Sequence, residues 1–295
     1  MLKRLLSQLA VALLWPLHVL PLPALAVLGQ GLGLLFFYLG KRRRKIVLIN
    51  LGLCFPELDK TEQQRLAIAH FKMLGRSVLE RTLLWWSSEK RLARLIRVDG
   101  EDKLRAAHQS GTPIILLAPH FVGLDAGGIG IAMRFNSMSM YSTQKNPVFD
   151  QLILRGRKRF RDQLLLSRQD GARSSIKAMR SGRPFYYLPD MDLGSRDSVF
   201  VPFFGIQAAT ITGLSRLSRA AGAVVISCVT RILPDGQGYV VEIGDPWTDF
   251  PTFNVEADTR RMNAFIESAV RTMPEQYYWV HRRFKTRPEG ESRLY

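Results

Sequence analysis

The segment from Leu5 to Gly40 constrains the chain most, because it contains no Asp, Glu, Lys or Arg. About 20 apolar residues span the core of a bilayer, and this segment is longer. Basic residues flank it: Lys3 and Arg4 come before it, and residues 41–45 after it are all Lys or Arg. The pattern favours a membrane anchor with the basic cluster 41–45 on the cytoplasmic side, following the positive-inside rule.

Two alternatives to an anchor stay open at this point. Ala24-Leu25-Ala26 resembles the cleavage site of a signal peptide, although the apolar run continues through Leu32–Leu39. A pair of helices buried in a globular body is the second alternative. Gly29 and Gly33 have the GxxxG spacing of a helix-packing face. We therefore expect the first 45 residues to form an anchor, distinct from the domain of residues 46–295.

The net charge limits the partners of the chain. The formal charge is +17; residues 1–45 contribute seven of these charges, which leaves +10 for residues 46–295. Such a surplus indicates an anionic partner: nucleic acid, an anionic membrane surface or a phosphorylated substrate. A hydrophobic fraction of 46% with 23% charged residues is typical of a globular protein. Only two cysteines, Cys54 and Cys228, exclude a disulfide framework.

Residues 46–295 alternate between apolar strand patterns and helical patterns, which predicts a single α/β domain with a largely parallel central sheet flanked by helices. The expected strands are 114–118, 185–188, 223–229 and 238–243, the last two forming a hairpin. The expected helices are 60–86, 122–133, 148–160, 172–181, 210–221 and 256–272. Thr61 and Gln64 have the spacing of a capping box for the first of these helices.

His120 and Asp125 form the sharpest chemical feature. His120 follows the strand 114–118 directly, and Asp125 comes five residues later, in the first turn of the next helix. Ligands of open α/β sheets bind at the carboxyl ends of the strands. A carboxylate bonded to one ring nitrogen fixes the tautomer of a histidine, which can then act as a general base. The alternative is a helix-capping aspartate beside a structural histidine.

Other chemistries lack their motifs. The sequence contains no G-x-S-x-G turn, no Walker A loop and no zinc-ligand spacing among its five histidines and two cysteines. We therefore expect no cofactor and no metal.

Four segments together resemble a known family. His120–Asp125 matches the H-x4-D/E signature of glycerolipid-type acyltransferases, and Tyr187–Gly194 resembles the Y-x-P-D-x-D-x-G block. Ser198–Gly205 and Pro274–Pro288 resemble two further blocks. The chain is similar, over nearly its whole length, to the late (secondary) acyltransferases of bacterial lipid A biosynthesis. One departure is Asp125, where related members often have glutamate.

The resemblance implies a glycerolipid-acyltransferase-like fold and transfer of a fatty acyl chain from acyl-acyl-carrier-protein to a phosphorylated glucosamine disaccharide lipid. The site would face the cytoplasm at the bacterial inner membrane. His120 and Asp125 carry over as the catalytic pair, and Arg157 and Asp190 as further site residues. Arg159 is a candidate for substrate binding within the basic cluster Arg155–Arg161, which is otherwise a solvated helix face.

Arg282 in the C-terminal block is a further substrate-binding candidate. The partners implied are the acidic carrier protein, an anionic glycolipid acceptor and the inner membrane. Two alternatives remain: an acyltransferase for another lysolipid (a lysophospholipid, an ornithine lipid or a glycolipid), or a membrane-tethered basic protein without catalysis. We expect no nucleic-acid partner, because the aromatic residues lie mostly in apolar runs rather than among basic ones.

Overall fold

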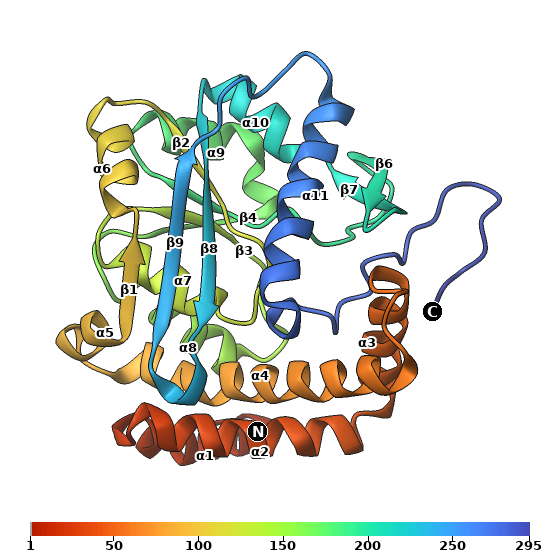
Figure 1. Cartoon of the computed structure of the whole chain (residues 1–295). Helices are drawn as coiled ribbons and strands as arrows, with labels where there is room; N and C mark the ends of the chain where they lie inside the picture. Colours follow the sequence, from red (N-terminus) through yellow and green to blue (C-terminus); the bar gives the residue numbers. More distant parts are fainter. Residues whose placement is uncertain (1) are drawn as a thin grey trace.

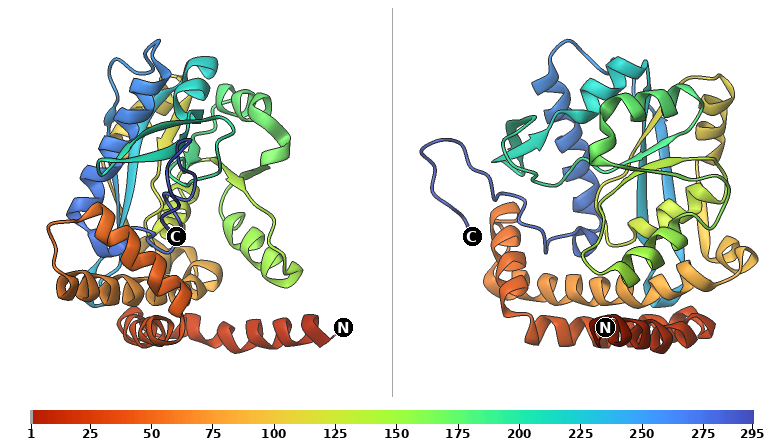
Figure 2. Two further views of the ribbon diagram at one scale, coloured as in Figure 1. Left: turned by 90° about the vertical axis from the view of Figure 1, so that its right-hand side faces the viewer. Right: turned by 180° about the vertical axis from the view of Figure 1, so that it is seen from behind.

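A seven-stranded sheet in the order β1-β9-β8-β2-β5-β3-β4 forms the centre of the computed structural model, which describes residues 2–295 (Figure 1). The strands β8, β2, β5, β3 and β4 run parallel, whereas β9 and β1 run in the opposite direction. Helices cover the sheet (Figure 2). The predicted α/β fold with a largely parallel sheet is confirmed.

The sheet strands are β1 (Ile96–Asp99), β2 (Ile114–Leu117), β3 (Met138–Tyr141), β4 (Leu164–Ser167), β5 (Phe185–Tyr187), β8 (Val224–Ile232) and β9 (Tyr239–Pro246). A separate hairpin consists of β6 (Ser198–Phe203) and β7 (Ile206–Ile211). The helices are α1 (Leu2–Leu14), α2 (Leu22–Leu39), α3 (Lys41–Cys54), α4 (Lys60–Trp86), α5 (Glu89–Leu95), α6 (Glu101–Gln109), α7 (Leu124–Ala132), α8 (Pro147–Arg157), α9 (Gly171–Arg180), α10 (Gly213–Ala221) and α11 (Val255–Thr272). Four 3-10 turns complete the chain: η1 (Trp15–Val19), η2 (Arg168–Asp170), η3 (Pro234–Gly236) and η4 (Pro274–Gln276).

The strand β2 is buried on both faces, as its apolar run predicts. Ile115 and Leu117 belong to one hydrophobic core, and Ile114 and Leu116 to the core on the other side. The expected hairpin is confirmed as the antiparallel pair β8–β9. The pattern missed β1, β3 and β4. Polar residues interrupt the apolar residues of β1 (IRVD) and β3 (MSMY), and the apolar run of β4 (LLLS) is only three residues long.

The capping box of α4 differs from the predicted one. The helix begins at Lys60, so the residue before it, Asp59, is the N-cap. The Asp59 side chain accepts a hydrogen bond from the Glu62 amide at 2.7 Å, and Glu62 accepts one from the Asp59 amide at 2.8 Å. Thr61 and Gln64, the predicted pair, lie inside the helix and do not cap it.

The helix α2 lies along α4 at the base of the molecule, whereas α1 extends away from α4 and contacts α8 (Figures 1 and 2). Glycines set this packing: a Cβ atom at Gly33 would lie 2.1 Å from the carbonyl oxygen of Phe71, and one at Gly75 would lie 2.2 Å from that of Gly29. The predicted helix-packing role of Gly29 and Gly33 is therefore confirmed.

The helix α2 is long and apolar enough to cross a membrane, and 33% of it is buried in this structure. Among the described large apolar side chains that are exposed, all but Leu193 and Phe253 lie within residues 5–39. The predicted boundary between residues 45 and 46 lies inside α3.

Candidate active site

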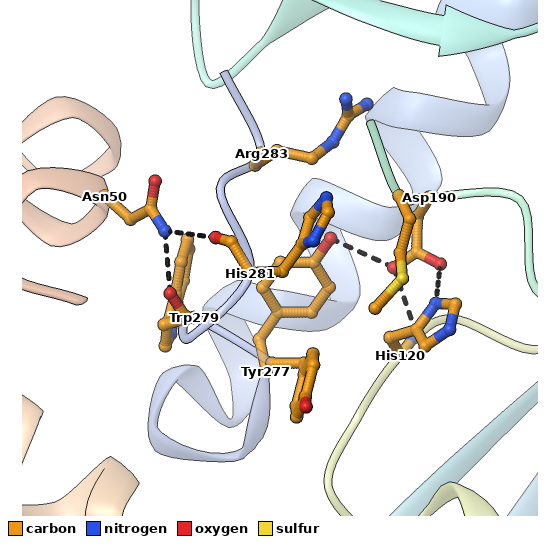
Figure 3. Close-up of a pocket in the computed structure, with 9 residues that line it drawn as sticks. Asn50, His120, Asp190, Tyr277, Trp279, His281 and Arg283 are labelled. Atoms are coloured by element: carbon orange, nitrogen blue, oxygen red, sulfur yellow. Dashed lines mark hydrogen bonds and ion pairs between the residues drawn. The ribbon is translucent and has the colours of Figure 1, made fainter. Parts of the chain in front are cut away.

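His120 and Asp190 meet because two neighbouring strands share one register. In the parallel pair β2–β5, Leu117 lies opposite Tyr187. His120 and Asp190 each follow three residues after these positions, at the carboxyl edge of the sheet. Asp190 Oδ1 lies 2.6 Å from His120 Nδ1, and Asp190 Oδ2 accepts a hydrogen bond from the His120 amide at 3.0 Å (Figure 3). The carboxylate therefore holds both the ring and the backbone of His120.

Asp190 is ionised in this environment. Burial raises its pKa, but the charge and hydrogen bonds of His120 and the hydrogen bond from Tyr277 outweigh burial and lower the pKa to about 2. The Tyr277 hydroxyl donates to Asp190 Oδ2 at 3.0 Å. Since a carboxylate only accepts hydrogen bonds, His120 Nδ1 carries a proton and donates a hydrogen bond to Asp190. Nε2 is the ring nitrogen that Asp190 does not engage, and the His120 side chain remains 18% exposed.

Asp125 does not form the bond to the ring of His120 that the sequence analysis predicted. Its carboxylate accepts from Arg81 Nε of α4 at 2.6 Å and from Arg157 Nη2 of α8 at 3.2 Å. Burial raises the pKa of Asp125, but these two guanidinium groups lower it to about 2. The predicted bond to the ring of His120 is therefore wrong: two cations hold Asp125, and Asp190 holds His120.

The predicted arginines fall into different settings. Arg157 lies beside Asp125, with its guanidinium 5.8 Å from the ring centre of Tyr141, and its side chain is 33% exposed. Arg159 donates to the carbonyl of Leu84 at 2.6 Å and to that of Ser87, so it closes the end of α4. The expectation that Arg159 binds substrate is not supported by this placement, because both terminal nitrogens of its guanidinium bond to backbone carbonyls.

Arg282 is not brought to His120 either. Its guanidinium lies 5.7 Å from the ring centre of Tyr295. The next residue, Arg283, is 2% exposed and donates to the Ala209 carbonyl at 2.9 Å and to Thr210 Oγ1 at 2.7 Å.

A small pocket surrounds His120 and Asp190, and most of its wall comes from the C-terminal block. The lining residues are Asn50, His120, Asp190, Met191, Tyr277, Tyr278, Trp279, His281 and Arg283 (Figure 3). Asn50 fixes this wall by donating to the carbonyls of Trp279 at 2.7 Å and His281 at 2.8 Å. The sequence analysis missed Tyr277, His281 and Arg81 as site residues; the resemblance of Pro274–Pro288 to a family block was the available signal for the first two.

A larger apolar cavity of about 420 Å³ lies next to this pocket. It is lined by Phe36, Leu39, Gly40, Arg43, Phe71, Leu74, Tyr278 and Val280. Tyr278 lines both, and its ring centre lies 6.5 Å from that of His120. Within residues 2–295, no cluster of three or more His, Cys, Asp or Glu side chains is arranged to hold a metal ion.

Comparisons with known proteins show what this chain is similar to. The family model of bacterial lipid A biosynthesis acyltransferases matches residues 1–286. The lipid A biosynthesis lauroyltransferase of Escherichia coli (strain K12) is 38% identical over 97% of this chain and 93% of its own length. The lipid A biosynthesis palmitoleoyltransferase of the same strain is 32% identical over 98% and 94%. The corresponding myristoyltransferase is 31% identical over 92% and 83%.

Proposed function

This chain belongs to the bacterial lipid A biosynthesis acyltransferase family, and we propose that it transfers a fatty acyl chain from acyl-acyl-carrier-protein to a hydroxyacyl chain of a lipid A precursor. The observation that carries the mechanism is the pair of His120 and Asp190. The pair leaves Nε2 of a fixed histidine as a base at the carboxyl edge of a parallel sheet.

The reaction needs a base and stabilisation of an oxyanion, because a thioester is already activated. His120 Nε2 removes the proton of the acceptor hydroxyl while the hydroxyl oxygen forms a bond to the thioester carbonyl carbon. The tetrahedral intermediate then collapses, the C–S bond breaks, and the proton passes from His120 to the leaving thiolate. Asp190 stays ionised and stabilises the imidazolium. No covalent bond to the enzyme forms.

Asp125 acts in this proposal through the arginines. It holds Arg81 and Arg157 in place, and the exposed part of Arg157 is available to a phosphate oxygen of the acceptor. The overall charge of +17 suits both an acidic carrier protein and a phosphorylated acceptor. Asp125 is therefore a positioning residue of the site.

The apolar cavity next to His120 suits the acyl chain. Its wall is mainly aliphatic and aromatic, and it adjoins the catalytic pocket at Tyr278. A chain bound there would bring its thioester to His120 while its apolar carbons leave water.

The exposed apolar side chains of α1, η1 and α2 suit the hydrocarbon region of the inner membrane. The basic side chains of Lys41, Arg42, Arg43 and Lys45 are exposed beside them and suit anionic headgroups. The proposal places the domain on the cytoplasmic side, where acyl-acyl-carrier-protein is found.

Purified protein tests the proposal with acyl-acyl-carrier-protein and a phosphorylated, hydroxyacylated glucosamine disaccharide. We expect one acyl chain added to the acceptor for each carrier thiol released, detected by mass spectrometry and thiol titration. Acyl-coenzyme A and lysophosphatidic acid serve as the alternative donor and acceptor. Faster acylation of lysophosphatidic acid would replace the proposal with that of a lysolipid acyltransferase, and faster transfer from coenzyme A would contradict the donor.

A further inference from the structure

His281 in the pocket wall is fixed at one ring nitrogen only. The amide of Asp192 donates to His281 Nε2 at 2.9 Å. An amide nitrogen is a donor only, so Nε2 carries no proton and the neutral ring must carry its proton on Nδ1. No hydrogen-bond partner is found for His281 Nδ1 in the described part of the chain. His281 lines the same pocket as His120 (Figure 3).

The surroundings of His281 keep it neutral. Burial, the charge of Arg283 and that of His120 lower the pKa of His281 to about 4. The charge of Arg283 is itself immobilised, because its guanidinium is held by Ala209 and Thr210 and its Nε is buried without an acceptor. Near neutral pH the pocket therefore contains a neutral N–H donor with a fixed positive charge beside it.

The segments around His281 are rigidly connected. Asp192, whose amide orients the ring, has its own carboxylate bonded to the Thr286 amide at 2.6 Å and to Thr286 Oγ1 at 2.8 Å. Asn50 holds the His281 carbonyl at 2.8 Å. Because the ring is held at Nε2 and the backbone at its carbonyl, the Nδ1 donor needs little reorganisation when charge develops nearby, which is the condition for effective transition-state stabilisation.

We propose that His281 is a second catalytic histidine, whose Nδ1–H donates a hydrogen bond to the oxyanion formed on the thioester carbonyl. This inference rests on the acyl transfer proposed above. His120 exchanges a proton with the substrates, whereas His281 keeps its proton and acts only as a donor. Neutral histidine serves as such an electrophile in other enzymes when its surroundings lower its pKa. Arg283 adds electrostatic stabilisation of the same negative charge.

Two substitutions separate a catalytic from a structural role. His281→Gln places a side-chain oxygen near the position of Nε2, so it keeps the acceptor for the Asp192 amide and loses the pocket donor. His281→Asn places its NH₂ group near the position of Nδ1, so it keeps the donor and loses the anchor. We expect His281→Gln to lower kcat about 100-fold, as removal of one oxyanion donor does, with KM and melting temperature near those of wild type. We expect His281→Asn to lower kcat about 10-fold or less.

The order of the two variants decides the proposal. A structural role predicts the reverse order, with His281→Gln near wild type and His281→Asn impaired and less stable; this order, or equal loss in both, overturns the proposal. His108→Gln, a histidine that packs on Phe135 in another region, is the matched control. Transfer by wild type must be observed first, so failure of the proposed function is distinguished from failure of this inference.

A measurement on the unmodified protein is independent of variant folding. In ¹⁵N-histidine-labelled wild type at pH 7, we expect the His281 resonance, assigned by its loss in His281→Gln or His281→Asn, to report a neutral ring protonated on Nδ1. A ring that is charged, or protonated on Nε2, overturns the proposal.

Discussion

Asp190, which follows β5, and Asp125, in the first turn of α7, are both ionised but have different partners. Asp190 and Asp125 both have a pKa lowered to about 2. Asp190 reaches this value beside an imidazole and a phenol, Asp125 beside two guanidinium groups. An imidazole can give and take a proton near neutral pH, whereas a guanidinium cannot. A lowered pKa of a carboxylate therefore does not by itself identify the acid–base pair. The group bonded to the carboxylate identifies it.

Removing the imidazole of His120 should have the largest effect on acyl transfer. We expect His120→Ala to lower acyl transfer by about 100- to 10,000-fold, the usual contribution of a general base, while the protein still folds. Release of the carrier thiol measures the rate, and His108→Ala, outside the site, is the control. Turnover near wild type in His120→Ala would show that no base is needed at this position.

Asp190→Asn tests the pairing of Asp190 with His120 and should have the second-largest effect. The amide keeps the shape but cannot stabilise an imidazolium and can select the wrong tautomer, so we expect a loss of the order of 100-fold or more. The loss should lie in kcat rather than KM. If Asp125→Asn is the more damaging of the two substitutions, the pairing of His120 with Asp190 does not operate during catalysis.

The sequence predicted one half of this site well. His120 follows a continuous apolar strand, so its place at the sheet edge could be predicted from the chain alone. Asp190 was identified as a site residue but not as the partner of His120, because that depends on the register of β2 with β5, strands about 70 positions apart. Sequence proximity favoured Asp125 instead.

The contacts of Asp125 with Arg81 and Arg157 could not be predicted from the sequence. Arg81 and Arg157 reach Asp125 from positions 44 and 32 residues away, on α4 and α8, and only tertiary packing shows that these helices converge. The basic pattern Arg155–Arg161 could not distinguish Arg157, which faces Asp125, from Arg159, which closes α4. The sheet centre was predicted, whereas the outer strands β1, β3 and β4 were missed because their apolar runs are interrupted or only three residues long.

Among substitutions around Asp125, Arg157→Ala should have a larger effect than Asp125→Asn. We expect a loss of about 10- to 100-fold, in the range of one charge-assisted hydrogen bond, and only partial recovery in Arg157→Lys, since an ammonium lacks the planar fork. Lys158→Ala is the matched control from the same cluster and should change activity mainly at low salt. Equal, salt-sensitive losses in both alanine variants would mean that the cluster acts only as a diffuse surface charge.

Asp125→Asn should be milder, at about 10-fold, because it loosens Arg157 without removing it. We expect the loss mainly in KM for the phosphorylated acceptor. Asp125→Glu should keep more activity than Asp125→Asn, since it retains the charge between Arg81 and Arg157. A kcat loss with an altered pH profile would instead indicate that Asp125 acts on His120.

The smallest expected difference is in acid stability, where the two carboxylates should behave alike. Folding lowers the pKa of both from the ordinary value of 3.8 to about 2, so the folded state binds their protons less readily than the unfolded state. Each carboxylate therefore stabilises the fold above about pH 4, and this stabilisation is lost as the pH falls towards 2. Acid unfolding followed by tryptophan fluorescence should show a shallower pH dependence between pH 4 and 2 in Asp190→Asn and in Asp125→Asn than in wild type, by similar amounts. Similar stability effects beside unequal kcat effects would separate ionisation, which the two sites share, from proton transfer, which only the imidazole supports. A shallower slope in one variant alone would show that the other carboxylate is not held ionised by its partners.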